Sequence, residues 1–232
     1  MTGSKTGTGR SAVVTGASSG IGRAIALTLL SKGWSVLGLS RSRPDIDHPG
    51  FDAISVDLLD EAALEAVLGE IREIDALIHA AGFLRVGRHD AMRLEDGKTM
   101  WRLHVNCAAQ LVQHLTSHMP DGGRIILIGS RVATGAAGRS LYAASKAALT
   151  GFARSVAAEL VSRQITVNVI APGATDTPML NDPNRADEPP KLPPFGRFVT
   201  PEEVAALAAF LLSDGAASLT GQEIVVCGGA SL

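Results

Sequence analysis

The stretch Ser11–Gly22, SAVVTGASSGIG, joins an apolar run to a glycine-rich turn and then opens a helical pattern. The run Ser11–Thr15 has no alternation of polar and apolar residues, which is typical of a parallel strand covered on both faces. Ile21–Lys32 has a helical pattern and is followed by Gly33, a residue that often terminates helices. Glycines here let the backbone approach a pyrophosphate, and the start of the helix favours anionic phosphates. The stretch therefore predicts a strand–turn–helix unit that binds a dinucleotide.

The spacing of the glycines qualifies this interpretation. Gly16, Gly20 and Gly22 follow the pattern Gly-x-x-x-Gly-x-Gly. The pattern typical of dehydrogenases is Gly-x-Gly-x-x-Gly, and a nucleoside-triphosphate loop would need a lysine that this turn lacks. Taken alone, the turn leaves open an ordinary connection between a strand and a helix.

Short apolar runs and longer helical patterns alternate along the rest of the chain. We expect further strands at Trp34–Leu39, Ala53–Val56, Ile74–His79, Arg124–Ile128, Ile165–Ile170 and Glu223–Cys227. We expect further helices at Glu61–Glu70, Lys98–His118, Leu141–Val161 and Pro201–Leu212, the last with Thr200 as its N-cap. This alternation predicts an α/β fold: a doubly wound, seven-stranded parallel sheet with helices on both faces. No linker interrupts it, so residues 11–232 are expected to form one domain after a flexible tail, residues 1–10.

Two segments depart from the alternation. Arg41–Gly50, RSRPDIDHPG, is too polar and too interrupted by proline for the crossover helix expected there. Asn181–Pro194 contains five prolines and both charge signs. It follows the sixth strand, at the carboxyl edge of the sheet where ligands bind, so we expect a substrate lid. A surface loop without a role is the alternative.

Composition excludes several classes of protein. The 232 residues carry a formal net charge of -2 and are 46% apolar, too apolar for a disordered chain and without the basic excess of a nucleic-acid binder. Two cysteines, Cys107 and Cys227, make no disulfide framework. No apolar stretch approaches the ~18 residues of a membrane span, and the polar start is not a signal peptide. We expect a cytoplasmic protein. No metal site is expected, because His114 and His118 lack further converging ligands.

The only tyrosine of the chain, Tyr142, stands four residues before Lys146 at the start of a helical pattern. This spacing puts both side chains on one helix face. A nearby ammonium lowers the pKa of a phenol from ~10, which makes a general acid/base for a carbonyl oxygen. The chain has one tyrosine and five lysines, so a chance pairing at this spacing is improbable.

Together these motifs closely resemble the single-domain branch of the short-chain dehydrogenase/reductase family. The resemblance covers about residues 11–230. The further motifs that carry it are His79-Ala80-Ala81-Gly82, Asn106, Ser130, Pro172-Gly173, Leu219-Thr220-Gly221-Gln222 and Gly228-Gly229.

The resemblance implies four catalytic residues. Tyr142 should give a proton to the substrate carbonyl, and Lys146 should lower the pKa of Tyr142 and bind the nicotinamide ribose. Ser130 should orient the substrate oxygen. Asn106 should hold a water that relays protons to Lys146.

The resemblance also implies a nicotinamide site. The expected cofactor-binding residues are Gly16, Ser18, Ser19, Gly20, Ile21, Gly22, Ser40, Arg41, Asp57, Leu58, Ala80, Ala81, Gly82, Tyr142, Lys146, Pro172, Gly173, Thr175 and Thr177. An acid at the end of the second strand would select NAD, but this chain has Ser40 followed by Arg41, with Arg43 nearby. Because a guanidinium suits a phosphate, NADP(H) is expected over NAD(H). The alternative is that Arg41 stacks on adenine or is solvated.

The sequence departs from the family pattern at several positions. The family usually has Asn-Asn-Ala-Gly where this chain has His79-Ala80-Ala81-Gly82, so Ala80 offers only backbone and His79 should have a structural role in the sheet. Ser130 and Tyr142 are 12 residues apart, one fewer than in many members. Cys227 replaces a usual aspartate. Arg85, Arg88 and Arg93 could attract an acidic or phosphorylated substrate, or form a solvated loop.

These observations predict an NADP(H)-dependent oxidoreductase that interconverts a small carbonyl compound and a secondary alcohol. The alternative is a non-catalytic, NADP-binding regulatory protein. An isomerase or dehydratase of the extended branch would need a larger C-terminal domain than 232 residues allow. The resemblance also implies a homotetramer or homodimer, packed through the long helices that hold Asn106 and Tyr142, with no nucleic-acid or membrane partner.

Overall fold

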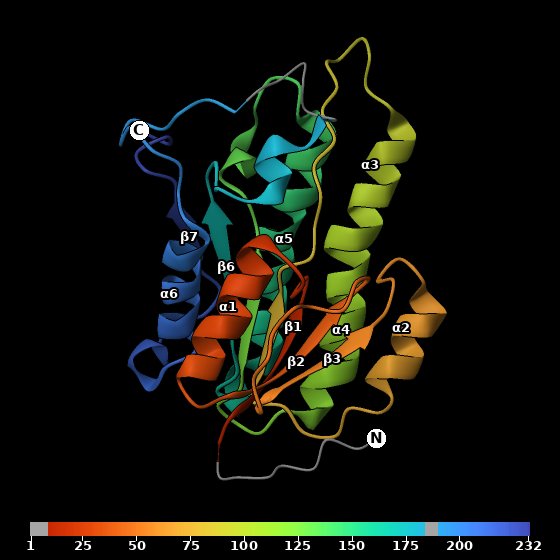
Figure 1. Ribbon diagram of the computed structural model, residues 1–232, viewed down its shortest axis with the longest axis vertical. Helices are drawn as coiled ribbons and strands as arrows, with labels where there is room; N and C mark the ends of the chain where they lie inside the picture. Colours follow the sequence, from red (N-terminus) through yellow and green to blue (C-terminus); the bar gives the residue numbers. More distant parts are fainter. Residues whose placement is uncertain (1–8, 184–189) are drawn as a thin grey trace.

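The computed structural model describes residues 9–183 and 190–232. Seven parallel strands form one sheet in the order β3-β2-β1-β4-β5-β6-β7 (Figure 1). The strands are β1 (Ser11–Thr15), β2 (Ser35–Ser40), β3 (Phe51–Ser55), β4 (Ala76–His79), β5 (Arg124–Ile128), β6 (Thr166–Pro172) and β7 (Glu223–Val226). The order reverses between β1 and β4, and at such a point the loops that follow the two strands diverge and open a crevice. The predicted fold class is confirmed.

Helices cover both faces of the sheet. They are α1 (Gly20–Ser31), α2 (Glu61–Leu68), α3 (Leu94–Trp101), α4 (Cys107–Leu115), α5 (Ser140–Leu160) and α6 (Pro201–Leu211). Helices α1 and α6 lie side by side on one face, and α2, α4 and α5 lie on the other (Figure 1).

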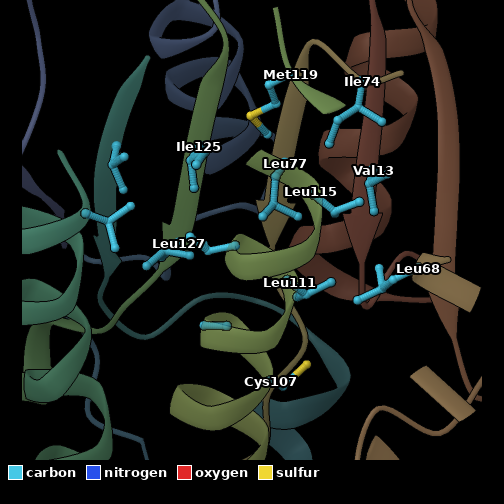
Figure 2. Packing of buried hydrophobic residues seen from close by; sticks show 14 of the residues in the cluster. Val13, Leu68, Ile74, Leu77, Cys107, Leu111, Leu115, Met119, Ile125 and Leu127 are labelled. Atoms are coloured by element: carbon cyan, nitrogen blue, oxygen red, sulfur yellow. The ribbon is translucent and has the colours of Figure 1, made fainter. Parts of the chain in front are cut away.

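The two faces of the sheet bury separate apolar cores. Figure 2 shows Leu111 and Leu115 of α4 packed toward Val13 of β1 and Leu77 of β4. The next residue along β1, Val14, belongs to the core under α1 and α6. Successive strand residues point to opposite faces, so a strand buried on both faces must be apolar at every position. This explains the uninterrupted apolar runs of the sequence.

Most predicted elements are found within two or three residues of their expected bounds. Helix α6 begins as predicted, because Thr200 accepts from the Glu203 N–H and the Glu203 carboxylate accepts from the Thr200 N–H in a capping box. The segment from Arg41 to Gly50 contains no helix, as expected.

The long helix predicted over Lys98–His118 is wrong in its details. The helix begins earlier, at Leu94, and a π-helical turn, η1 (Arg102–Asn106), separates α3 from α4. A π turn inserts one extra residue, so side chains after it are rotated away from the faces that a regular helix would give them. This change of register affects the candidate site.

Some expectations fall outside the described residues. Residues 1–8 of the predicted tail and residues 184–189 of the predicted lid are among them. A short 3-10 turn, Pro178–Asn181, in which Leu180 is buried, leads directly into the predicted lid, Asn181–Pro194. Within residues 9–183 and 190–232, no helix combines the length and apolarity needed to cross a membrane.

Candidate active site

A pocket of about 610 Å³ lies along the carboxyl ends of the strands. Loops that follow β1, β2, β4, β5 and β6 contribute to its wall. The sequence-predicted residues that line it are Gly16, Ser18, Ser19, Gly20, Ile21, Gly22, Ser40, Arg41, Asp57, Leu58, Ala80, Ala81, Gly82, Ser130, Tyr142, Lys146, Pro172, Thr175 and Thr177. The fold thus brings almost all of the predicted site residues to one cavity.

Gly173 is not brought to this pocket. Its N–H donates to the Val226 carbonyl at 2.8 Å. A Cβ at this position would lie 3.0 Å from the Cα of Cys227. Gly173 therefore allows close packing between the ends of β6 and β7, and its contact with the cofactor stays a prediction.

The glycine-rich turn after β1 fits tightly against the loop after β4. Gly16 has a φ of +70°, and a Cβ there would lie 2.9 Å from the backbone of Ala81. A Cβ on Gly22 would overlap the Gly16 carbonyl. In the described part of the chain, Ser19 makes no side-chain cap and the first turn of α1 has no acidic residue. The N–H groups at the start of α1 therefore remain available to an anion.

Thr15 ties the end of β1 to the loop after β4. Its buried hydroxyl oxygen accepts from the N–H groups of Ala80 and Ala81, both at 3.1 Å, and lies 2.9 Å from Nδ1 of His79. Nε2 of His79 lies 3.0 Å from the Leu103 carbonyl in the π turn. Burial, with the charge of Lys146, lowers the pKa of His79 to about 3. His79 is therefore a neutral structural side chain that joins three segments of the site, as expected.

Tyr142, Lys146 and Ser130 form the polar end of the pocket. Tyr142 and Lys146 lie on the buried face of α5, and the Lys146 Nζ is 5.9 Å from the centre of the Tyr142 ring. The Nζ donates to the Ile128 carbonyl at 2.7 Å. Ser130, directly after β5, is buried, and its hydroxyl oxygen accepts from the Val132 N–H at 3.3 Å.

Burial also controls the charge of Lys146. Its side chain is enclosed between α5 and the end of β5, and this desolvation lowers the pKa of the ammonium to about 7. The lysine therefore titrates near neutral pH in the protein without ligands. A group that can gain or lose a proton in this range beside a phenol is suited to proton transfer.

The structure does not bring the Asn106 side chain to the pocket wall, and its role in holding a water for Lys146 stays a prediction. The Asn106 side chain is exposed and is not part of the pocket wall. His104, two residues earlier, is fully buried and points toward α5, where its Nδ1 lies 2.9 Å from the Ser145 hydroxyl. The physical reason is the π turn η1, which changes which residue of this segment faces the site.

Arg41 and Ser40 lie where the second strand ends. Ser40 is buried, and its hydroxyl donates to the Ser42 carbonyl at 2.8 Å. Arg41 is exposed and contributes to the pocket wall with Asp57, whose carboxylate accepts from the Leu59 N–H. Arg41 therefore follows β2, and strands β1 and β4 lie between β2 and β5, the strand that leads to Ser130.

The predicted basic cluster is partly neutralised within the protein. Arg85 Nη1 lies 3.1 Å from Asp182 Oδ2, and the guanidinium stacks 5.0 Å from the Phe83 ring. Arg93 pairs with Asp96 at 3.6 Å. The pair of Arg85 and Asp182 joins the loop after β4 to the segment after β6 across the pocket.

A small apolar cluster lies behind Tyr142, next to the pocket. Leu84, Met100 and Val132 pack with Tyr142 in a small buried cluster. Met179 packs against this cluster and also lines the pocket. Within the described ranges, no group of three histidine, cysteine or acidic side chains could hold a metal ion.

The family model described as enoyl-(acyl carrier protein) reductase matches residues 16–231. The chain belongs to the short-chain dehydrogenase/reductase family. A 3-oxoacyl-[acyl-carrier-protein] reductase of Escherichia coli is 40% identical over 237 residues, covering 95% of this chain and 97% of that protein. The 2,3-dihydro-2,3-dihydroxybenzoate dehydrogenase of the same organism is 35% identical over 243 residues, covering 97% and 98%.

Solved structures of this family share the fold. A short-chain dehydrogenase from Burkholderia cenocepacia J2315, crystallised in complex with NADP, superposes with a TM-score of 0.86 at 33% identity, covering 97% of this chain and 98% of that one. This short-chain dehydrogenase/reductase therefore has the doubly wound sheet of the oxidoreductases in its family.

Sequence reasoning missed two features of the site. His104 was not predicted, because the resemblance pointed to Asn106 in this segment and a regular helix gave no sign of the π turn. The contact of Arg85 with Asp182 joins residues 97 positions apart, and only the sheet topology brings them together.

Proposed function

We propose that this short-chain dehydrogenase/reductase transfers a hydride between NADP(H) and a small molecule with a carbonyl or secondary alcohol group. The observation that carries the proposal is the meeting of Ser130, Tyr142 and Lys146 in the same pocket as the glycine-rich turn. One end of this pocket offers proton-transfer groups, and the other offers a cradle for phosphates. The two ends are joined in one cavity, as a reaction between a cofactor and a second molecule requires.

The residues present fit a dinucleotide. Gly16 and Gly22 allow a tight turn in which a Cβ would overlap the protein's own backbone, and the start of α1 presents free N–H groups to a pyrophosphate. Arg41, on the pocket wall where a NAD-specific site would have an acid, supports NADP(H) over NAD(H). When bound, the nicotinamide group supplies or accepts the hydride.

The protein's own residues supply proton transfer and orientation. The Tyr142 hydroxyl gives its proton to the carbonyl oxygen during reduction and recovers it during oxidation. In its charged form, the Lys146 ammonium favours the phenolate of Tyr142, because an opposite charge nearby stabilises the ionised state. The Ser130 hydroxyl donates a hydrogen bond to the same substrate oxygen and stabilises the charge that develops there.

The wall around Tyr142 favours a neutral, partly apolar substrate. Phe83, Met179 and Leu180 line the pocket and offer carbon surface, and Arg85 is already paired with Asp182. An anionic substrate would have to compete with that carboxylate for the guanidinium. The two Escherichia coli relatives are described as acting on different substrates, so we base this proposal on the pocket wall and not on either relative.

The test is a panel of ketones, aldehydes and secondary alcohols with NADPH, NADP⁺, NADH and NAD⁺. The proposal predicts turnover of at least one neutral carbonyl compound with NADPH. NADPH binding without turnover on any member of a broad panel would favour the non-catalytic, NADP-binding regulatory protein.

We also propose that the protein works as a homodimer or homotetramer that packs through α4 and α5. The exposed apolar side chains of Trp101, at the end of α3, and Val161, just after α5, support an interface on this side. Light scattering after size exclusion tests the proposal, and a monomer at working concentration would contradict it.

A further inference from the structure

His104 is a buried histidine to which the proposed mechanism gives no role. It stands in the π turn η1, and its side chain reaches between the loop after β4 and helix α5. Its ring makes an edge-to-face contact with the Tyr142 ring, with the ring centres 5.6 Å apart at 86°. A Cβ on Gly82 would lie 3.0 Å from the His104 Nε2 and 3.5 Å from the Lys146 Nζ. His104 and Lys146 therefore flank the same glycine of the pocket wall.

Both ring nitrogens of His104 have partners. The Phe83 N–H, directly after Gly82, donates to Nε2 at 3.3 Å. Nδ1 lies 2.9 Å from the Ser145 hydroxyl, which itself donates to the Tyr142 carbonyl at 2.8 Å. Because Nε2 accepts and the Ser145 proton is already donated, the ring proton must be on Nδ1. The hydrogen bonds run in one direction, from the loop after β4 through His104 and Ser145 to the backbone of Tyr142.

This arrangement requires a neutral ring. A second ring proton would face the Phe83 N–H and leave that N–H without an acceptor. Burial, and then the nearby positive charge of Lys146, lower the pKa of His104 well below its usual value and outweigh the opposing effect of the Phe83 backbone. His104 therefore has no free proton position with which to exchange protons with the substrate.

We propose that His104 is a positioning residue, which holds the turn of α5 carrying Tyr142 and Lys146 at a fixed place against the loop after β4. The inference rests on the proposed function, because the positioned groups are those of the proposed reaction. Tyr142 and Lys146 are one helical turn apart, and Ser145 lies between them in the sequence. A tether at Ser145 therefore fixes both the phenol and the ammonium relative to Gly82.

Three substitutions separate the hydrogen bond from the Phe83 N–H to Nε2 from the hydrogen bond between Nδ1 and Ser145. His104→Asn keeps a donor near the place of Nδ1, His104→Gln keeps an acceptor near the place of Nε2, and His104→Leu keeps neither. His114→Asn, on the neighbouring helix α4 and outside the pocket wall, is the matched control. We expect His104→Leu to lower kcat about tenfold or more, since small misplacements of reacting groups are costly, while the NADPH dissociation constant changes less than about twofold. The Asn and Gln variants should lie between wild type and Leu, and His114→Asn should match wild type.

The pH profile distinguishes positioning from support of the fold. If the phenol moves away from the Lys146 ammonium, the pKa of the phenol rises, so the acidic limb of the oxidation rate should move to higher pH in the His104 variants. A lower melting temperature with kcat within about twofold of wild type and an unchanged pH profile would overturn the proposal. If His104→Leu does not fold, His104→Asn and His104→Gln provide this test.

A spectroscopic measurement on the wild-type protein tests the inference without turnover. Nitrogen-15 NMR should show His104 as the neutral tautomer with its proton on Nδ1, and this state should persist from pH 5 to pH 9 (about the range in which an ordinary histidine titrates). A ring that titrates in this range, or the opposite tautomer, would overturn the inference. Absence of carbonyl turnover in the wild type would instead refute the proposed function. The NMR measurement does not depend on turnover, so it would still test the hydrogen bonds of His104.

Discussion

Replacing Thr15 with valine removes the hydroxyl that joins β1 to the loop after β4 while keeping a β-branched side chain. In the native protein this hydroxyl oxygen accepts two backbone N–H bonds, from Ala80 and Ala81, and contacts Nδ1 of His79. Thr15 is fully buried, so water cannot replace these partners. Each bond contributes about 1 kcal/mol net, so the loss of all three should lower the free energy of unfolding by about 3 kcal/mol.

Urea or guanidinium unfolding, followed by circular dichroism, measures this change. The midpoint should fall with the m-value unchanged, because the surface exposed on unfolding is the same. Thr15→Ser is the matched control, since it retains the hydroxyl and should lose only the smaller contribution of one methyl group, about 1 kcal/mol. A valine variant within about 1 kcal/mol of wild type, or a serine variant that is as unstable as the valine variant, would refute the role given to the hydroxyl.

Three further predictions concern the cofactor end and the buried titratable groups. Gly16→Ala should raise the NADPH dissociation constant, measured by titration, at least about tenfold, because Gly16 has a φ of +70° and an added Cβ would meet the Ala81 backbone. An unchanged dissociation constant would show that the glycine-rich turn does not bind the phosphates. Arg41→Ala should lower the ratio of kcat/KM with NADPH to that with NADH, and a constant ratio would show that Arg41 does not bind the phosphate. The free energy of unfolding should fall as the pH falls from about 6.5 toward 3. The reason is that the pKa of His79 is about 3 in the folded protein and about 6.5 for a solvated histidine in the unfolded chain. Denaturant unfolding at a series of pH values should show a weaker pH dependence for His79→Gln than for wild type.

The parts of the site that the sequence predicted depend on local periodicity. Tyr142 and Lys146 lie on one regular helix, so their spacing was sufficient to put them on one face. The glycine-rich turn lies between a strand and a helix that are adjacent in the chain. In both cases the relevant geometry is fixed within about ten residues, and tertiary packing only preserves it.

The parts that the sequence did not predict depend on irregular geometry or on distant contacts. The π turn places the His104 side chain against α5, and the Leu103 carbonyl of the same turn lies 3.0 Å from Nε2 of His79 in β4. No regular period signals such a turn, because it is stabilised by partners outside its own segment. Gly173 was assigned from a motif, and its lack of a Cβ allows the close packing of the ends of β6 and β7.

The central claim is that Tyr142 transfers the proton in a reaction between NADPH and a carbonyl compound. The direct measurement is the rate of NADPH oxidation by Tyr142→Phe, with the NADPH dissociation constant of the same protein measured by fluorescence. Loss of a general acid should lower kcat at least about 100-fold, while NADPH affinity changes far less, because the phenyl ring retains the packing of Tyr142 with Leu84, Met100 and Val132. A variant that reduces the carbonyl compound at a rate near that of wild type would contradict the claim.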